Sequence, residues 1–125
     1  MKKIGVTQIV IVDDHVAYRE ALAQILRGCL DFEVLGLGGS ADEAVCLARQ
    51  FEPDVLLLDL EMPGCGLEAA RRLAHSSPTV EVFVLTFSND PLNRAEAHRA
   101  GVRQYLLKGI SSRELAEAIR SRGVE

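Results

Sequence analysis

The chain has 125 residues, with 14 basic and 18 acidic side chains and a formal net charge of −4 at pH 7. This length suits one ordinary domain, and 48% hydrophobic with 26% charged residues excludes a disordered chain, a collagen-like repeat and a disulfide-stapled miniature domain. No cluster of Lys and Arg marks a surface that follows a phosphate backbone, so we expect no direct nucleic acid contact from this domain.

Neither a secretory signal nor a membrane span is apparent. Acidic residues interrupt the first apolar stretch, and no later run approaches the roughly 18 residues of a spanning helix. Cys29, Cys46 and Cys65 fit neither a CxxC redox pair nor a zinc motif, and we expect the first two to be helical core residues. His15 and His75 are expected at exposed helix ends without metal-binding partners. We therefore expect a soluble, cytoplasmic protein with reduced thiols and no membrane contact.

Short apolar runs alternate with helical patterns along the chain. The runs lack the polar alternation of a half-exposed sheet, which indicates strands covered by helices on both faces. Strands are expected at Gln8–Val12, Glu33–Leu37, Asp54–Leu58, Val80–Leu85 and Gln104–Leu107. Helices are expected at His15–Arg27, Ala41–Gln50, Leu67–Ala74, Asp90–Ala100 and Ser112–Arg120.

The order of these elements predicts the fold. Five strand and helix units in about 120 residues form an α/β, doubly wound parallel sheet in the flavodoxin-like order 2-1-3-4-5. The first helix is expected to bury one stripe, composed of Ala21, Leu22, Ile25 and Leu26. The Asp90–Ala100 helix has few apolar residues to pack, and we expect it to be mobile.

Polar residues follow the carboxyl ends of the central strands. Asp13 and Asp14 follow the first expected strand and Asp59 the third, while Thr86 and Lys108 end the fourth and fifth. Ligands of doubly wound sheets bind beyond this edge, so the sequence predicts that these side chains converge on one site.

Carboxylates gathered at one edge repel one another unless a cation joins them. Mg²⁺ binds carboxylates together with water and phosphate oxygens, so we expect Asp14 and Asp59 as direct ligands with Asp13 behind them. Lys108 and Thr86 would add positive charge and a hydroxyl donor for a phosphoryl group. Because a carboxylate can attack phosphorus once Mg²⁺ screens the repulsion, the pattern predicts phosphoryl transfer to Asp59.

These residues also carry a family resemblance. In their order and spacing, the following segments resemble the receiver domains of two-component response regulators: Val12–His15, Pro53–Gly64, Val84–Thr86, Ala100–Gly101 and Tyr105–Lys108. The resemblance covers nearly the whole chain, and we take residues 1–125 as one receiver domain. The DDH start, Arg19, the segment GLEA and the segment YLLK are similar to receivers that precede a LuxR-type helix-turn-helix.

The resemblance implies a switch operated by phosphorylation, not a metabolic enzyme. A sensor histidine kinase would donate a phosphoryl group to Asp59. The Mg²⁺ ion would be held by Asp13, Asp14, Asp59 and the backbone carbonyl of Glu61.

The resemblance also implies how the signal spreads. Thr86 and Lys108 would bind the phosphoryl group, Thr86 after moving toward it, and Tyr105 would turn inward behind Thr86. The changed surface would promote a homodimer and control an output, here expected to be transcription. The chain would be either the receiver of a regulator whose DNA-binding output domain it lacks, or a stand-alone receiver that acts by protein contact.

Two positions depart from the family pattern. Only Cys65 separates Gly64 from Gly66, so the loop after the acceptor is one residue short. Lys108 is followed by Gly109, where proline is usual, and a cis bond there would lose proline's help. The short loop leaves open a receiver that binds partners without being phosphorylated.

Two unrelated functions fit parts of the sequence less well. The segment Gly36–Ala41 satisfies a dinucleotide-binding fingerprint, but such a site would leave Asp13, Asp14 and Lys108 unexplained, and a turn in which Ser40 and Glu43 form a capping box is the favoured interpretation. A phosphohydrolase of the haloacid dehalogenase type would also use Asp59 as its nucleophile, but it needs a second aspartate where Glu61 stands and usually a cap domain.

Overall fold

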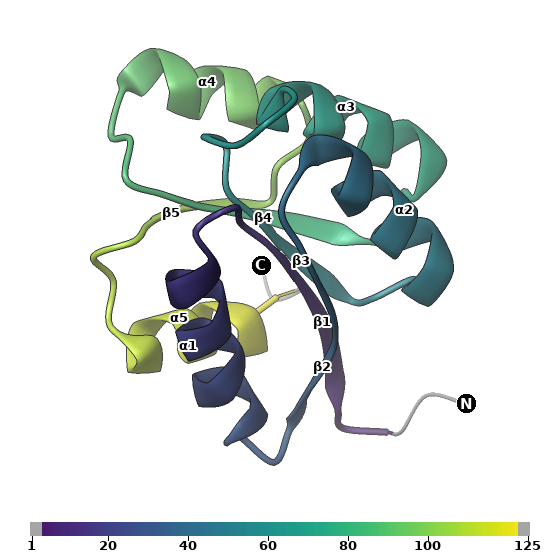
Figure 1. Ribbon diagram of the computed structural model, residues 1–125, viewed down its shortest axis with the longest axis vertical. Coiled ribbons are helices and arrows are strands. Elements are labelled where there is room, and N and C mark those ends of the chain that lie inside the picture. The colour runs from purple at the N-terminus through teal and green to yellow at the C-terminus, as the bar shows by residue number, and fades with distance from the viewer. Residues whose placement is uncertain (1–3, 123–125) are drawn as a thin grey trace.

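The computed structural model describes residues 4–122, which form five strands and five helices in alternation (Figure 1). Residues 1–3 and 123–125, which the expected domain includes, lie outside the described residues. The strands are β1 (Thr7–Val12), β2 (Phe32–Gly38), β3 (Val55–Leu58), β4 (Glu81–Thr86) and β5 (Gln104–Leu107). The helices are α1 (Val16–Arg27), α2 (Ala41–Phe51), α3 (Gly66–Ser76), α4 (Pro91–Arg99) and α5 (Ser112–Arg120).

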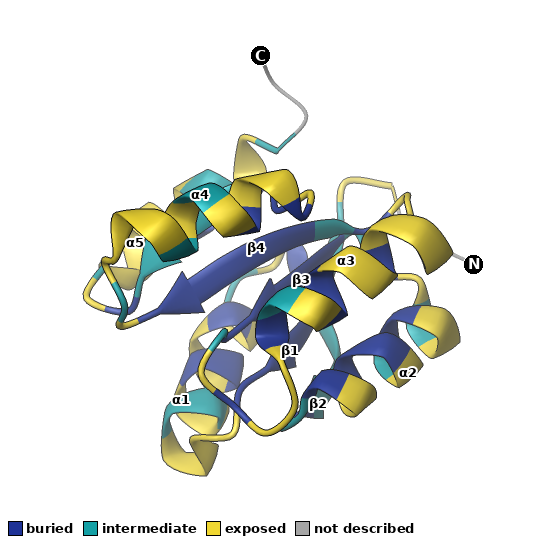
Figure 2. Cartoon of the chain, turned by 90° about the horizontal axis from the view of Figure 1, so that it is seen from above, coloured by how far each residue is buried: buried dark blue, intermediate teal, exposed yellow. Residues whose placement is uncertain are grey.

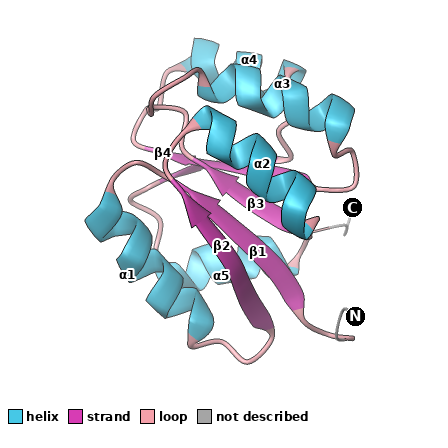
Figure 3. Cartoon of the chain, turned by 45° about the vertical axis from the view of Figure 1, so that its right-hand side comes forward, coloured by secondary structure: helices cyan, strands magenta, loops and turns pink. Residues whose placement is uncertain are grey.

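All strand pairs are parallel, and the sheet order is β2-β1-β3-β4-β5, as the sequence predicts (Figure 3). Val12 of β1 lies opposite Leu58 of β3, so the residues that follow these two strands leave the sheet side by side. Thr86 of β4 lies opposite Leu107 of β5. This register brings the polar strand ends to one edge.

Helices cover both faces of the sheet, with α2, α3 and α4 on one side and α1 and α5 on the other (Figure 1). Alternate residues of each central strand point to opposite layers: Val10 packs beneath α2 and α3, and Ile9 packs against α1 and α5. The strands are therefore buried on both faces, as Figure 2 shows for β3 and β4, which explains their uninterrupted apolar sequence.

Hydroxyl side chains cap two of the helices. Ser40 accepts the Glu43 N–H at 3.2 Å, as expected, but the Glu43 carboxylate accepts its bond from the Gly39 N–H and not from the backbone of Ser40. A complete capping box occurs at α5, where Ser111 and Glu114 bond reciprocally.

Gly36 and Gly38 lie within β2 and not in the turn that follows it. A Cβ on Gly38 would come within 2.9 Å of Leu47, and one on Gly36 within 3.0 Å of Phe51. These glycines let α2 pack closely on β2. The fingerprint of a dinucleotide site places its glycines in the strand-to-helix turn, so this spacing has a packing origin here.

Three expectations about side-chain burial are wrong, and a fourth holds only in part. In α1, Ala23 is buried, whereas Ala21 is exposed and Ile25 is 47% exposed, so the buried stripe is rotated from the expected one. Cys46 is exposed and Cys29 is only half-buried. The errors at Ala21, Ile25 and Cys46 arise because periodicity alone leaves the edge of a helical face uncertain by one residue, whereas Cys29 lies beyond the end of α1.

Helix α4 packs weakly. Ala97 is its one buried residue, and Leu92 is 69% exposed. Within residues 4–122, no helix combines the length and apolar character needed to cross a bilayer.

Candidate functional site

A buried ion-pair network lies at the carboxyl edge of the sheet. Lys108 Nζ lies 2.7 Å from Asp13 Oδ2 and 3.1 Å from Asp59 Oδ2. The side chains of Lys108, Asp59 and Asp13 are 1%, 2% and 4% exposed. The parallel register of β1 and β3 places the two carboxylates side by side, and the end of β5 supplies the ammonium.

Burial and the bonds within the network have opposite effects on the pKa values of Asp59 and Lys108, and the balance differs between the two residues. Burial raises the pKa of Asp59, although the Glu61 N–H and Lys108 both bond its carboxylate and act in the opposite direction. Burial disfavours the Lys108 ammonium, but its bonds to Asp13 and Asp59 outweigh that effect and raise its pKa. Lys108 therefore stays charged at neutral pH.

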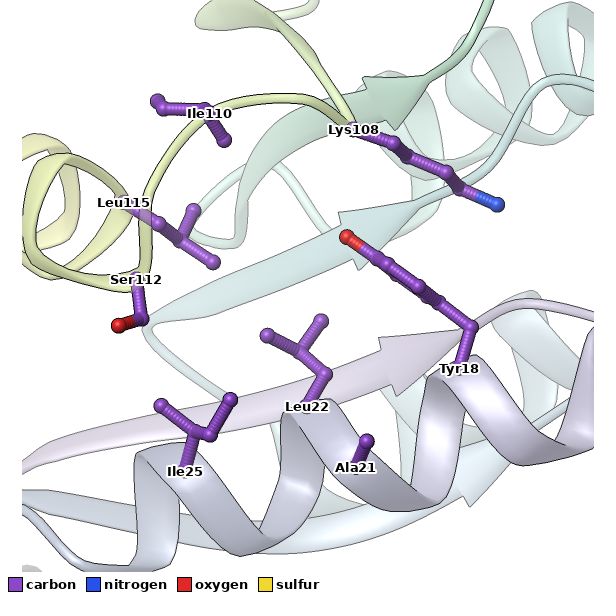
Figure 4. Close-up of a pocket in the computed structure, with 8 residues that line it drawn as sticks. All are labelled: Tyr18, Ala21, Leu22, Ile25, Lys108, Ile110, Ser112 and Leu115. Carbon is purple, nitrogen blue, oxygen red and sulfur yellow. The ribbon is translucent and has the colours of Figure 1, made fainter.

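Two aromatic rings face the ammonium of Lys108. Its Nζ lies 4.6 Å from the centre of the Tyr18 ring and 5.0 Å from that of Phe87. Figure 4 shows the Lys108 side chain passing over Tyr18 at the start of α1. Burial raises the pKa of Tyr18, so its phenol remains neutral beside the site.

Asp14 and His15 complete the cluster on its solvent side. The imidazole Nδ1 of His15 lies 3.1 Å from Asp13 Oδ1, 3.5 Å from Asp14 Oδ1 and 3.8 Å from Asp59 Oδ2. The expectation that His15 is exposed is confirmed, because its side chain is 57% exposed. The expectation that it lacks possible metal-binding partners is wrong. The missed signal was the turn in which Asp13 accepts the His15 N–H at 2.9 Å, which folds the ring back over the carboxylates.

The donor set fits a divalent cation. Asp13, Asp14, His15 and Asp59 each offer one ligand atom, and these atoms lie within 4.8 Å of one another. Three carboxylates beside one ammonium leave two negative charges, which a divalent ion balances.

Arg19 of α1 braces the loop that carries the acidic pair. Its Nη1 donates to the carbonyl oxygens of Asp13 at 3.1 Å and Gly38 at 3.0 Å. The guanidinium therefore ties the end of β1 to the end of β2.

Thr86 ends β4 and Tyr105 lies in the neighbouring β5, and each hydroxyl is bonded to a group other than Asp59. The Thr86 hydroxyl, fully buried, donates to Glu61 Oε1 at 3.1 Å. The half-buried Tyr105 donates its hydroxyl to the Ser88 carbonyl at 2.7 Å, and the Arg94 guanidinium lies 4.7 Å from its ring centre.

The short loop after Asp59 closes compactly. Gly64 adopts a φ of +80°, and the Ala41 N–H donates to the Pro63 carbonyl at 3.1 Å. A Cβ on Gly66 would lie only 2.7 Å from Leu60 Cα. Glycine at position 66 thus permits the close approach of the loop to the start of α3. None of the peptide bonds in the described part of the chain is cis, including the one after Lys108.

The fold and site together define a doubly wound α/β domain whose acidic pocket is closed by a buried lysine. The family model of the response regulator receiver domain matches residues 9–120. The chain belongs to this family.

Named relatives agree with that assignment. The chain is 39% identical over 114 residues to the transcriptional regulatory protein DegU of Brevibacillus brevis, covering 90% of this chain and 48% of that protein. It is 36% identical to the response regulator UvrY of Escherichia coli, covering 90% of this chain and 52% of that one. The chain thus spans about half the length of the curated relatives it matches.

Solved structures show the same fold. A LuxR-family DNA-binding response regulator from Staphylococcus aureus aligns with a TM-score of 0.87 at 31% identity, covering 93% of this chain and 98% of that one. A LuxR-family two-component response regulator from Aurantimonas aligns with a TM-score of 0.87 at 28% identity, covering 93% and 84%.

Proposed function

We propose that this chain is a phosphorylation-operated switch in which Asp59 accepts a phosphoryl group from a sensor histidine kinase. The observation that carries the proposal is the buried Lys108 ammonium shared by Asp13 and Asp59. A buried charge of this kind is costly unless it stabilises a charged partner, and an acyl phosphate on Asp59 would be such a partner. The membership of the receiver family supports the same chemistry.

The residues divide the work of phosphoryl transfer. A carboxylate oxygen of Asp59 attacks phosphorus, the bond from phosphorus to the donor breaks, and the donor leaves with that electron pair. Lys108 neutralises charge on the phosphoryl oxygens, and Thr86 exchanges its bond to Glu61 for one to the phosphoryl group. Asp13, Asp14, Asp59 and the Glu61 carbonyl would hold Mg²⁺, which would supply positive charge against the repulsion between carboxylate and phosphate.

The change then reaches the surface through β4, β5 and α4. Withdrawal of Thr86 toward the phosphoryl group frees space that Tyr105 fills by turning inward, which breaks its bond to the Ser88 carbonyl. Helix α4 follows the Ser88 segment and packs weakly, so it is the element that shifts most easily.

The output is proposed from the relatives. DegU, which is named for transcriptional regulation, has about twice this length, so we assign the chain the receiver role in a transcriptional regulator that acts in the cytoplasm as a homodimer once phosphorylated. DNA would be reached through an output domain and not through this acidic domain. A stand-alone or phosphorylation-defective receiver that acts by binding is the alternative, and the short Gly64–Gly66 loop is the feature that favours it.

Intact-mass spectrometry after incubation with acetyl phosphate tests the proposal. The wild-type chain should gain a single phosphoryl adduct with Mg²⁺ and none in EDTA, and Asp59→Asn should gain none. Asp42→Asn is the matched control, because Asp42 is an exposed carboxylate on α2 whose side chain is 90% exposed. No adduct on the wild-type chain would favour signalling by binding alone, and catalytic release of phosphate from a small phosphomonoester would favour a hydrolase.

A further inference from the structure

His15 offers a possible metal-ligand atom at the acidic pocket, and the proposed phosphoryl transfer assigns no role to this residue. It precedes the first turn of α1 and makes no side-chain bond that caps the helix. Its Nδ1 faces the carboxylates of Asp13, Asp14 and Asp59 at 3.1 to 3.8 Å. The imidazole therefore points into the group of ligand atoms and not along its own helix.

We propose that His15 Nδ1 is a direct metal ligand, so that the pocket prefers a divalent late first-row transition ion such as Co²⁺ or Ni²⁺ to Mg²⁺. This inference rests on the proposed function for the place of the metal. Mg²⁺ takes oxygen ligands and gives up its water reluctantly, whereas imidazole nitrogen suits transition ions. A mixed site of one nitrogen and three carboxylates would therefore discriminate between these two classes of ion.

The distances are those of atoms that can share one ion. Ligands bonded at about 2.0–2.2 Å to a common ion lie roughly 3.0–3.5 Å from one another in tetrahedral or octahedral arrangements. The Nδ1 of His15 meets that condition toward Asp13 and Asp14, and small adjustments would bring Asp59 into range.

The lysine of the network does not compete for the same side of Asp13. Lys108 binds Asp13 Oδ2, whereas His15 faces Oδ1. Oxygen Oδ1 of Asp13 also accepts the His15 N–H at 2.9 Å, which holds the backbone of the histidine at the pocket. The ring itself lies 3.1 Å from the same oxygen, a contact that is a hydrogen bond when Nδ1 carries a proton, and a bound ion would take the place of that proton.

Metal titrations of the full chain test the inference. Co²⁺ is followed by its visible absorption and Mg²⁺ by calorimetry, with wild type, His15→Gln and His75→Gln. Wild type should bind Co²⁺ at least tenfold more tightly than Mg²⁺, and His15→Gln should lose about tenfold in Co²⁺ affinity with a much smaller loss for Mg²⁺. His75→Gln is the matched control, because His75 is an exposed histidine near the end of α3. Electron spin echo spectroscopy of bound Mn²⁺ should detect a coordinated nitrogen in wild type and not in His15→Gln.

Each result separates this inference from the proposed function. Unchanged Co²⁺ affinity in His15→Gln would overturn the inference, and so would a rise in affinity for both ions, which would show that His15 opposes metal binding. If wild type then still gains its Mg²⁺-dependent adduct on Asp59, the proposed function stands alone. If nitrogen coordination is found without any adduct, the metal assignment stands and the phosphorylation proposal fails.

Discussion

At the residue scale, the fold holds more carboxylates than positive charges close together at the pocket, and this arrangement costs free energy. Asp13 and Asp59 are almost fully buried, and they share Lys108 as their charged partner among the described residues. With Asp14 close by, negative charge exceeds positive charge at the pocket. The repulsion between these negative charges lowers the stability of the protein without a bound ion, and a bound cation would reduce that repulsion.

Neutralising Asp59 should therefore stabilise the empty protein. Burial raises the pKa of Asp59 in the folded state, so its charged form costs stability at every pH above that pKa. In EDTA at pH 7.5, Asp59→Asn should raise the Tm by roughly 3–5 °C, which corresponds to about 1 kcal/mol for a domain of this size. Asp42→Asn, which loses only an exposed pair with Arg72, should not raise the Tm.

The rise in Tm expected for Asp59→Asn should depend on pH in a defined direction. The advantage of Asp59→Asn should be complete above the folded-state pKa, shrink as the pH falls through it, and disappear below the ordinary value of 3.8, where both states bind the proton. Thermal melts across this range check it. A lower Tm for the variant at pH 7.5 would show that the bond to Lys108 outweighs the cost of burying the charge.

Glycine 66 decides whether the short loop can close. A Cβ there would meet the Leu60 Cα at 2.7 Å and the Asp59 carbonyl at 3.1 Å, and backbone atoms cannot turn aside as a side chain can. Gly66→Ala should therefore cost about 2–4 kcal/mol in urea unfolding and weaken phosphorylation of Asp59. Gly109→Ala is the matched control, because nothing lies within 4 Å of its Cβ and its φ is not positive, and it should unfold like wild type.

At the element scale, an ion pair joins the start of β2 to the end of α5. Arg120 donates to both Asp31 oxygens, at 2.7 and 3.0 Å, and this bonding lowers the pKa of Asp31. The pair's contribution to stability is therefore present above the ordinary value of 3.8 and lost as the pH falls through the lower folded-state pKa.

Asp31→Asn removes that charge while leaving Arg120 against Phe32. The urea midpoint of the variant should fall at pH 7 and rejoin that of wild type once the pH lies below the folded-state pKa of Asp31. Added salt should shrink the difference at pH 7, since the pair is exposed. Glu117→Gln, which breaks an exposed pair with Arg113 within α5, provides a comparison, and an equal effect there would argue against a special role for the Asp31 pair.

At the scale of the whole molecule, the sequence predicts the sheet and most of the site because both follow from strand order. Apolar runs predict the strands, the doubly wound fold class gives their order, and parallel register then brings Asp13 and Asp59 together. His15 escaped prediction because its place depends on a local turn and a side-chain rotamer. Ala21, Ile25 and Cys46 were misplaced because helical periodicity does not specify how far a helix is rotated against its sheet.

Helices α4 and α5 provide a comparison of packing at equal length. Each has 9 residues, but α5 buries Leu115, Ala116 and Ile119 and carries a full capping box, whereas α4 buries only Ala97. Local opening depends on how much apolar surface an element keeps from water, so α4 should open far more often than α5.

Amide hydrogen exchange followed by mass spectrometry measures this difference directly. In the unphosphorylated chain, peptides from α4 should exchange on the order of 100-fold faster than those from α5. Acetyl phosphate with Mg²⁺ should change the α4 rate more than the α5 rate, and Asp59→Asn should abolish that change. Equal protection of the two helices would mean that α4 is held by contacts beyond Ala97, and the moving element of the switch would then have to be sought elsewhere in the fold.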